Sequence, residues 1–219
     1  FLTKLKFVYP NSNSDLGRYS FLNYPENNDK LYNCLEQLDI PISKMSYVDI
    51  TIEQAYKDVP AAVVQEIEDD FKEMYQQDED KDEATISVVM RLGDNYYIIE
   101  AGADGFKNIK TILFTHGKYG KYEFREESDG TKRILELLEM ITSPEKDVTY
   151  VVDEIDRSLH SLLSEQLICM YLNPETANQN QLIITTHESR LLNLKRLRKD
   201  EIYFVTNRNG ESGFVRLDE

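Results

Sequence analysis

The stretch that decides the fold is Val148-Thr149-Tyr150-Val151-Val152-Asp153-Glu154-Ile155-Asp156, an apolar strand that ends at two adjacent carboxylates. In a parallel sheet, ligands bind beyond the carboxyl ends of the strands, so Asp153 is placed to hold a Mg²⁺ ion through its water shell. Glu154 is then placed to orient or deprotonate an attacking water. The alternative interpretation is a buried strand that merely ends in surface acids.

Short apolar runs alternate with amphipathic helices in the C-terminal part of the chain. The runs are Val148–Val152, Leu182–Thr185 and Ile202–Val205. Thr131–Ile141 and Leu159–Leu172 carry apolar residues at helical spacing. Strands separated by helices of this length predict βαβ units and a parallel sheet that contains all three runs.

A second candidate feature is Gln181-Leu182-Ile183-Ile184-Thr185-Thr186-His187, where another apolar strand ends in hydroxyl residues and a histidine. A neutral imidazole at this sheet edge can donate a hydrogen bond to a γ-phosphate oxygen. The alternative is that His187 is an ordinary core or surface histidine. We interpret His116 and His160 in that ordinary way. His116 and His187 do not have the spacing of a metal pair, and Cys34 and Cys169 lack a ligand pattern, so a structural zinc site is not expected.

A polar turn precedes the helix predicted from Thr131. It reads Phe124-Arg125-Glu126-Glu127-Ser128-Asp129-Gly130-Thr131. Free N–H groups at a helix N-terminus, a serine hydroxyl and a glycine that permits close approach make an anion site. The alternative is a helix cap in which Ser128 or Asp129 satisfies the first N–H groups.

The first half of the chain shows structure but no evident chemistry. We expect a helix at Lys30–Leu38, an acidic helix from Pro60 to Gln77, a solvated acidic loop at Asp78–Glu83, a hairpin of Thr85–Leu92 and Tyr96–Glu100, and a strand at Thr111–Thr115.

The composition is that of a globular protein with a local excess of acid. The 219 residues include 40 acidic and 25 basic side chains, giving a formal net charge of −15. Residues 66–83 hold ten acids, which argues against broad DNA binding by this segment alone. No apolar run reaches the roughly 18 residues that a membrane helix needs. Cys34 and Cys169 lie far apart, so we expect free thiols and a cytoplasmic protein without a secretory leader.

The order and spacing of these motifs resemble the second half of an ATP-binding-cassette (ABC-type) ATPase. The likeness is to bacterial ATPases of the abortive-infection and restriction-associated kind, relatives of the overcoming-lysogenization-defect and SMC-type ATPases. In that family Glu127–Thr131 looks like the signature motif and Val151–Glu154 like Walker B. Residues Arg157-Ser158-Leu159-His160 look like the D-loop, and Thr185–His187 like the switch-histidine loop.

The resemblance implies an α/β P-loop NTPase fold, ABC-ATPase-like, with a mostly parallel sheet flanked by helices. Its N-terminal half is expected to be incomplete, with an α+β inserted lobe. Residues 1–110 are expected to form the rest of the N-terminal lobe and the inserted acidic helix and hairpin, and residues 111–219 the ATPase-like half.

Two departures from the family pattern matter. No Gly-x-x-x-x-Gly-Lys-Ser/Thr occurs, so the phosphate-binding Walker A loop is expected on an N-terminal segment of a longer protein. The chain alone is therefore not expected to bind ATP tightly. Asp129 stands where glycine is usual and brings a carboxylate toward the γ-phosphate, and His160 replaces the acid of the D-loop.

The function that the resemblance implies is Mg²⁺-dependent ATP hydrolysis. Residues Ser128, Asp129, Gly130 and Thr131 of one protomer would close over ATP on the Walker A loop of another, forming a homodimer through an ATP sandwich. Asp153 would hold the metal, Glu154 would activate water and His187 would sense the γ-phosphate. Hydrolysis would gate an effector protein, or act on DNA, in anti-phage defence or a repair-like process. The alternatives are an AAA+ type ATPase and a non-catalytic interaction module.

Overall fold

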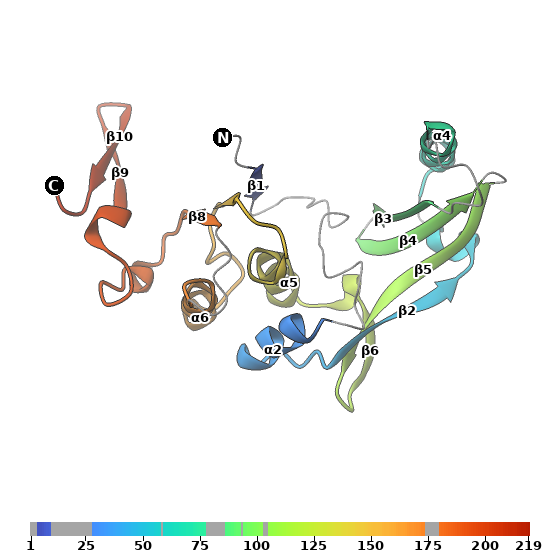
Figure 1. The fold of residues 1–219 in the computed structure, drawn as a ribbon, viewed down its shortest axis with the longest axis horizontal. Coiled ribbons are helices and arrows are strands. Elements are labelled where there is room, and N and C mark those ends of the chain that lie inside the picture. Colours follow the sequence, from blue (N-terminus) through green and yellow to red (C-terminus); the bar gives the residue numbers. More distant parts are fainter. Residues whose placement is uncertain are drawn as a thin grey trace.

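The computed structural model describes residues 4–9, 28–57, 59–77, 86–92, 94–102, 105–173 and 180–219. These residues form a three-stranded sheet, a five-stranded sheet and a two-stranded hairpin (Figure 1). Among them, no helix is both long and apolar enough to cross a membrane. The acidic run at 78–83 lies outside the described residues.

The three-stranded sheet is parallel and has the order β1-β7-β8. Its strands are β1 (Lys4–Val8), β7 (Val148–Val152) and β8 (Gln181–Ile184). Helices α5 (Asp129–Thr142) and α6 (Ser161–Tyr171) lie together on one side of it (Figure 1). Tyr150 and Val152 are buried in the same cluster as the apolar residues of α5 and α6, which confirms the predicted βαβ arrangement around β7.

The prediction that Ile202–Val205 belongs to the parallel sheet is wrong. That run falls in β9 (Tyr203–Arg208), which pairs antiparallel with β10 (Glu211–Arg216) in a separate hairpin. Asn209 and Gly210 between them have φ angles of 55° and 87°, the left-handed conformation that a two-residue hairpin turn requires. The Asn209-Gly210 turn therefore pairs β9 with the adjacent strand β10. The remaining strand of the parallel sheet is β1, which pairs with β7.

The five-stranded sheet forms a second lobe with the order β2-β5-β4-β3 and β6 paired with β5. Its strands are β2 (Lys44–Ile50), β3 (Ile86–Leu92), β4 (Asn95–Gly102), β5 (Gly105–His116) and β6 (Gly120–Glu123). The predicted hairpin is confirmed as β3 and β4. β5 is longer than predicted and runs across residues 110 and 111.

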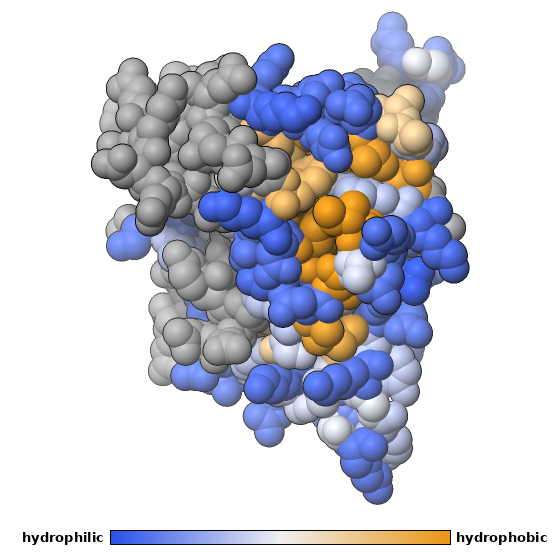
Figure 2. Space-filling model, turned by 90° about the vertical axis from the view of Figure 1, so that its right-hand side faces the viewer, coloured by the Kyte–Doolittle hydropathy of each residue, from blue (hydrophilic) through white to orange (hydrophobic). Residues whose placement is uncertain are grey.

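Helices α3 (Ile52–Ala55) and α4 (Ala61–Gln77) belong to this lobe, and α2 (Asp29–Gln37) contacts α5. α2 and α4 confirm the two helices predicted in the first half of the chain. Figure 2 looks at the lobe from the right-hand side of Figure 1 and shows an apolar band between polar margins. The remaining helical turns are η3 (Phe124–Glu126), η4 (Ser189–Leu191) and η5 (Lys199–Glu201).

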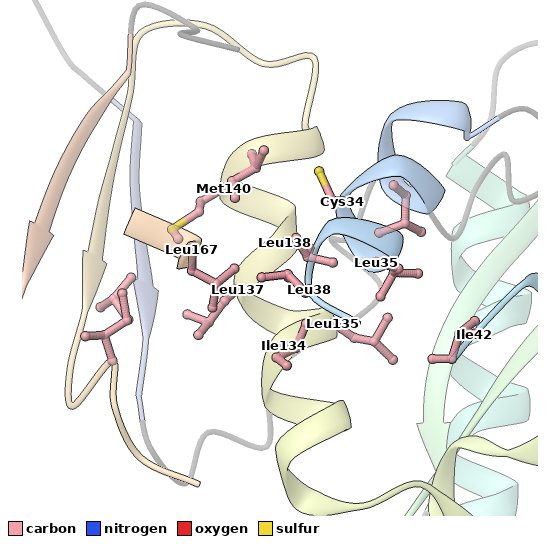
Figure 3. Packing of buried hydrophobic residues seen from close by; sticks show 14 of the residues in the cluster. Cys34, Leu35, Leu38, Ile42, Ile134, Leu135, Leu137, Leu138, Met140 and Leu167 are labelled. Carbon is pink, nitrogen blue, oxygen red and sulfur yellow. The ribbon is translucent and has the colours of Figure 1, made fainter. Parts of the chain in front are cut away.

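Two apolar cores hold these elements together. The larger core joins α2, α5, α6 and the parallel sheet to one face of the lobe, and Figure 3 shows α5 lying between α2 and the strands. The smaller core lies under α3 and α4. Adjacent residues of β4 divide between them, since Tyr96 belongs to the larger core and Tyr97 to the smaller. Cys34 and Cys169 are both free, as expected.

Candidate functional site

The carboxyl ends of β7 and β8 meet at one edge of the parallel sheet. Pairing of Val152 with Ile184 brings the residues that follow each strand side by side. The Thr185 hydroxyl donates to Asp153 Oδ1 over 2.5 Å and accepts the Glu154 N–H over 2.9 Å. One hydroxyl thus fixes the side chain of the first acid and the backbone of the second. The sequence had placed Thr185 only within the switch loop, and this bridging role was missed.

Glu154 turns toward the histidine predicted to work with it. Its φ of 46° lies in the left-handed region, which is strained for a residue with a side chain. Glu154 Oε1 lies 3.9 Å from His187 Nε2, and Glu154 Oε2 lies 3.5 Å from Arg157 Nη1. The Glu154 and His187 side chains are 37% and 87% exposed. Such open pairs contribute little to stability, so the acid and the imidazole remain available to a ligand.

The loop that carries these acids is anchored to both strands. The Asp153 N–H donates to the carbonyl of Val8 in β1, and the Ile155 N–H donates to the carbonyl of Thr185. Ile155 is completely buried, and the Thr186 hydroxyl donates to Asp156 Oδ1. The position of Asp153 and Glu154 is therefore set before any ligand arrives, as a site for charged substrates requires.

Arg133 of α5 is a buried residue that sequence reasoning missed. Its Nη2 donates to the carbonyls of Asp153 and Glu154 over 3.0 and 3.4 Å. Its Nη1 donates to the carbonyl of Tyr9 over 3.3 Å and to Glu136 over 3.1 Å. A basic residue beside Ile134 and Leu135 on the apolar face of the helix was the signal available in the sequence.

Ser128 caps α5. Its hydroxyl oxygen accepts the Thr131 N–H over 3.1 Å, which confirms the cap interpretation of this turn. Asp129 is the first residue of the helix, where its charge favours the helix dipole. A Cβ on Gly130 would lie 3.1 Å from the carbonyl oxygen of Ser158, so a larger residue would require the next loop to move away by a few tenths of an ångström.

The Ser158-Leu159-His160 loop follows the two acids and leads into α6. Ser158 has a φ of 61°, a second left-handed residue near the site. His160 is the N-cap of α6, and its Nδ1 accepts the Leu162 N–H over 3.3 Å. The His160 imidazole thus caps α6, and an acidic side chain at this position could cap the helix in the same way.

A buried hydrogen-bonded pair lies next to the Ser128 turn. His116 Nε2 of β5 is 2.7 Å from Glu127 Oε1, and Glu127 is almost fully buried. Burial raises the pKa of Glu127, and the hydrogen bond from His116 opposes that rise. His116 is therefore the hydrogen-bond partner of a buried glutamate, which agrees with its interpretation as an ordinary core or surface histidine.

The predicted residues fall into two groups. Asp153, Glu154 and His187 meet at the edge of the parallel sheet, and the Ser128–Thr131 turn lies against the Ser158 loop. Arg133 connects the helix of the second group to the backbone of the first. Among the described residues, no three His, Cys, Asp or Glu side chains form a metal cage. Mg²⁺ in nucleotide sites takes one or two carboxylates, waters and phosphate oxygens, and an Asp153 held by Thr185 fits that demand.

A scan against protein families matches residues 7–193 to the family described as "AAA domain, putative AbiEii toxin, Type IV TA system". The match covers most of the chain, so the chain belongs to this family of AAA-domain ATPases. The expected α/β P-loop NTPase fold is confirmed. A search of curated proteins gave no match.

Two solved structures are similar to the chain. One is described as "Structural biochemistry of ATP-driven dimerization and DNA stimulated activation of SMC ATPases", with 15% identity, a TM-score of 0.38, and coverage of 71% of this chain and 85% of that one. The other is an SMC head bound to the C-terminal winged-helix domain of ScpA, with 17% identity and a TM-score of 0.40. Coverage there is 97% of this chain and 56% of that one.

Proposed function

We propose that this chain carries the hydrolytic residues of a Mg²⁺-dependent ATPase. Asp153 holds the metal through its water shell, Glu154 orients and deprotonates the attacking water, and His187 donates a hydrogen bond to the γ-phosphate. The observation that supports this most is the Thr185 hydroxyl, which holds both acids at the carboxyl edge of a parallel sheet. A strand ending in unattached surface acids needs no such bridge.

The phosphate-binding loop is proposed to come from a Walker A segment that adds to the open side of the parallel sheet. Among the described residues, β8 pairs only with β7, so its other edge has no partner strand. Ile183 on β8 is 47% exposed, and Leu5 and Phe7 on β1 are 60% and 52% exposed. Strand registers place all three on one face of the sheet, which supports a strand at the edge of β8 and a helix over this face.

The second half of the proposal concerns assembly. The Ser128–Thr131 turn is at the surface with Thr131 half-buried, so it is accessible to ATP bound on another protomer. We propose that ATP joins two protomers and that its hydrolysis releases them. The family description names a toxin–antitoxin system, and we propose that this cycle gates a defence effector or one that acts on DNA.

ATP turnover and dimerisation of the 219-residue chain, with and without the Walker A segment of its parent protein added in trans, test the proposal. We expect turnover only with the segment, and Glu154→Gln should abolish turnover while stabilising the ATP-bound dimer. Glu211→Gln, on the exposed β10 strand, is the matched control and should behave as wild type. Absence of turnover and of a nucleotide-dependent dimer would instead support the non-catalytic interaction module.

A further inference from the structure

The chain passes from the five-stranded lobe to α5 through η3, and η3 is fixed to the lobe (Figure 1). Phe124 of η3 is buried, and its ring packs edge-on against Tyr96 of β4 with the centroids 4.7 Å apart. The same ring lies 6.2 Å from the ring of Phe114 of β5. All three rings belong to the larger core. Because such interiors are closely packed, a shift of the lobe strands carries η3 with it.

Glu127 joins η3 to the Ser128 turn and is held from the side of the lobe. Its N–H donates to the carbonyl of Phe124 over 3.1 Å. Its Oε1 lies 2.7 Å from Nε2 of His116, the last residue of β5, and the Glu127 and His116 side chains are only 3% and 16% exposed. An ionised carboxylate only accepts hydrogen bonds, so the imidazole nitrogen is the donor. The residue next to Ser128 is therefore tied to the lobe by its backbone and by its side chain.

The imidazole of His116 is itself held in place. Its ring lies edge-on to the ring of Tyr122 of β6, with the centroids 5.0 Å apart. A buried carboxylate loses its hydration, so an apolar side chain at position 127 would serve packing at least as well. A hydrogen bond adds direction, because it fixes both the distance and the angle between donor and acceptor. The pair of His116 and Glu127 therefore gives the joint between β5 and the Ser128 turn a defined geometry.

We propose that His116 positions the Ser128 turn through Glu127, so that the lobe regulates ATP-dependent dimerisation. This inference rests on the proposed function, because there the turn contacts ATP bound on another protomer. His116 is a positioning residue and not a catalytic one, since its hydrogen bond is to Glu127. A displacement of β5 moves Glu127 and the groups presented at the start of α5. Loss of the hydrogen bond weakens closure of the dimer and leaves the hydrolysis step, which depends on Asp153 and Glu154, unchanged.

ATP turnover of the chain completed with the Walker A segment, measured over a range of protomer concentrations, tests the proposal. The double variant His116→Leu, Glu127→Met removes both polar groups and keeps the interior apolar, so its stability in urea should stay close to wild type. We expect it to need roughly tenfold more protomer for half-maximal turnover, because a hydrogen bond to a charged group no longer holds the turn. Turnover at saturating protomer should match wild type. His116→Gln retains an amide donor and should restore the wild-type concentration dependence.

Lys110→Gln is the matched control on the same strand. It breaks another hydrogen-bonded pair of β5, in which Lys110 Nζ lies 2.6 Å from Glu100 Oε1, and it should behave as wild type. Hydrogen exchange of the 219-residue chain alone gives a measurement without ATP. The Thr131 N–H, which the Ser128 hydroxyl accepts, should exchange faster in the double variant and at the wild-type rate in Lys110→Gln.

Failure of this proposal can be told apart from failure of the proposed function. A wild-type enzyme that neither hydrolyses ATP nor dimerises with it overturns the proposed function, and the regulation by the lobe with it. An active wild type together with an unchanged protomer requirement and unchanged Thr131 exchange in the double variant overturns the positioning role of His116 alone. Lower turnover at saturating protomer, with the same concentration dependence, also overturns it, because the pair would then act on hydrolysis. Failure of His116→Gln to restore the wild-type behaviour would show that the hydrogen bond is not what positions the turn.

Discussion

At the scale of single residues, the site depends on hydroxyl and carbonyl groups that the motifs do not feature. Asp153 and Glu154 are recognisable in sequence because an apolar strand ends at them. What holds them is Thr185 from the neighbouring strand and Arg133 from α5, and neither contact follows from local spacing. Residues that act through a neighbour in space become visible only when the strands are placed side by side.

Thr185→Val removes the hydroxyl that bridges the two acids, and we expect ATPase activity of the completed enzyme to fall about 10- to 100-fold. The Glu154 N–H and the Asp153 carboxylate would each lose a partner, and because both hydrogen bonds are exposed, water replaces part of the interaction and each loss should cost at most about 0.5–1.5 kcal/mol. Thr185→Ser keeps the hydroxyl and should retain most of the activity. Steady-state turnover measures the loss of ATPase activity, and urea unfolding measures the loss of stability. Equal activity of the valine and serine variants would show that the bridge has no role in catalysis.

Glu127 should make stability depend on pH in the direction set by its raised pKa. Burial makes the folded state hold the Glu127 proton more strongly than the unfolded state does. The stability contributed by this group is therefore fully present below the unfolded pKa and falls as pH rises through the folded pKa. Glu127→Gln does not titrate, so its stability relative to wild type should increase across that window. Urea unfolding of both proteins from acid to neutral pH measures the difference, and a difference that stays constant with pH would contradict it.

At the scale of elements, local patterns predicted the helices and strands but not every partner. The amphipathic repeats of α5 and α6 and the apolar run of β7 are confirmed, because each buries one face against the same core. The error over β9 has a physical cause. An apolar run specifies a strand, whereas the choice between a distant parallel neighbour and an adjacent hairpin depends on the Asn209-Gly210 turn. β1 was not predicted as part of the parallel sheet because its partner, β7, lies far away in the sequence and no local turn indicates the pairing.

The start of α5 offers a way to separate capping from nucleotide contact. Ser128→Ala removes the N-cap and should cost about 1 kcal/mol in stability. Ser128→Asp keeps a capping oxygen and should leave stability close to wild type, but it adds negative charge where the proposed γ-phosphate approaches. We therefore expect the aspartate variant to unfold normally and to lose ATP-dependent dimerisation. Thermal unfolding and sedimentation with ATP and the Walker A segment measure both. An aspartate variant that still dimerises would limit Ser128 to capping.

At the scale of the whole molecule, apolar surface remains exposed on the parallel sheet. Ile183 lies on β8, which has a free edge among the described residues, and Leu5 and Phe7 lie on the same face. Exposed strand edges with apolar side chains favour association between copies. We expect the 219-residue chain alone to self-associate with increasing concentration, and Ile183→Lys to reduce this. Light scattering measures it, with Val205→Lys on β9 as the comparison. An unchanged association in Ile183→Lys would place the contact elsewhere.

Arg133 binds carbonyl groups from two segments that are distant in the sequence, at Tyr9 and at Asp153, while belonging to a third itself. Substitutions near any of these segments therefore change the hydrogen bonds of the same side chain, Arg133. A change at Tyr9 that shifts its carbonyl and a change at Glu136 that frees the guanidinium should not add independently. Sequence drift at one of the three segments constrains what the other two can accept, so compensating replacements are expected to arise together across more than a hundred residues of chain.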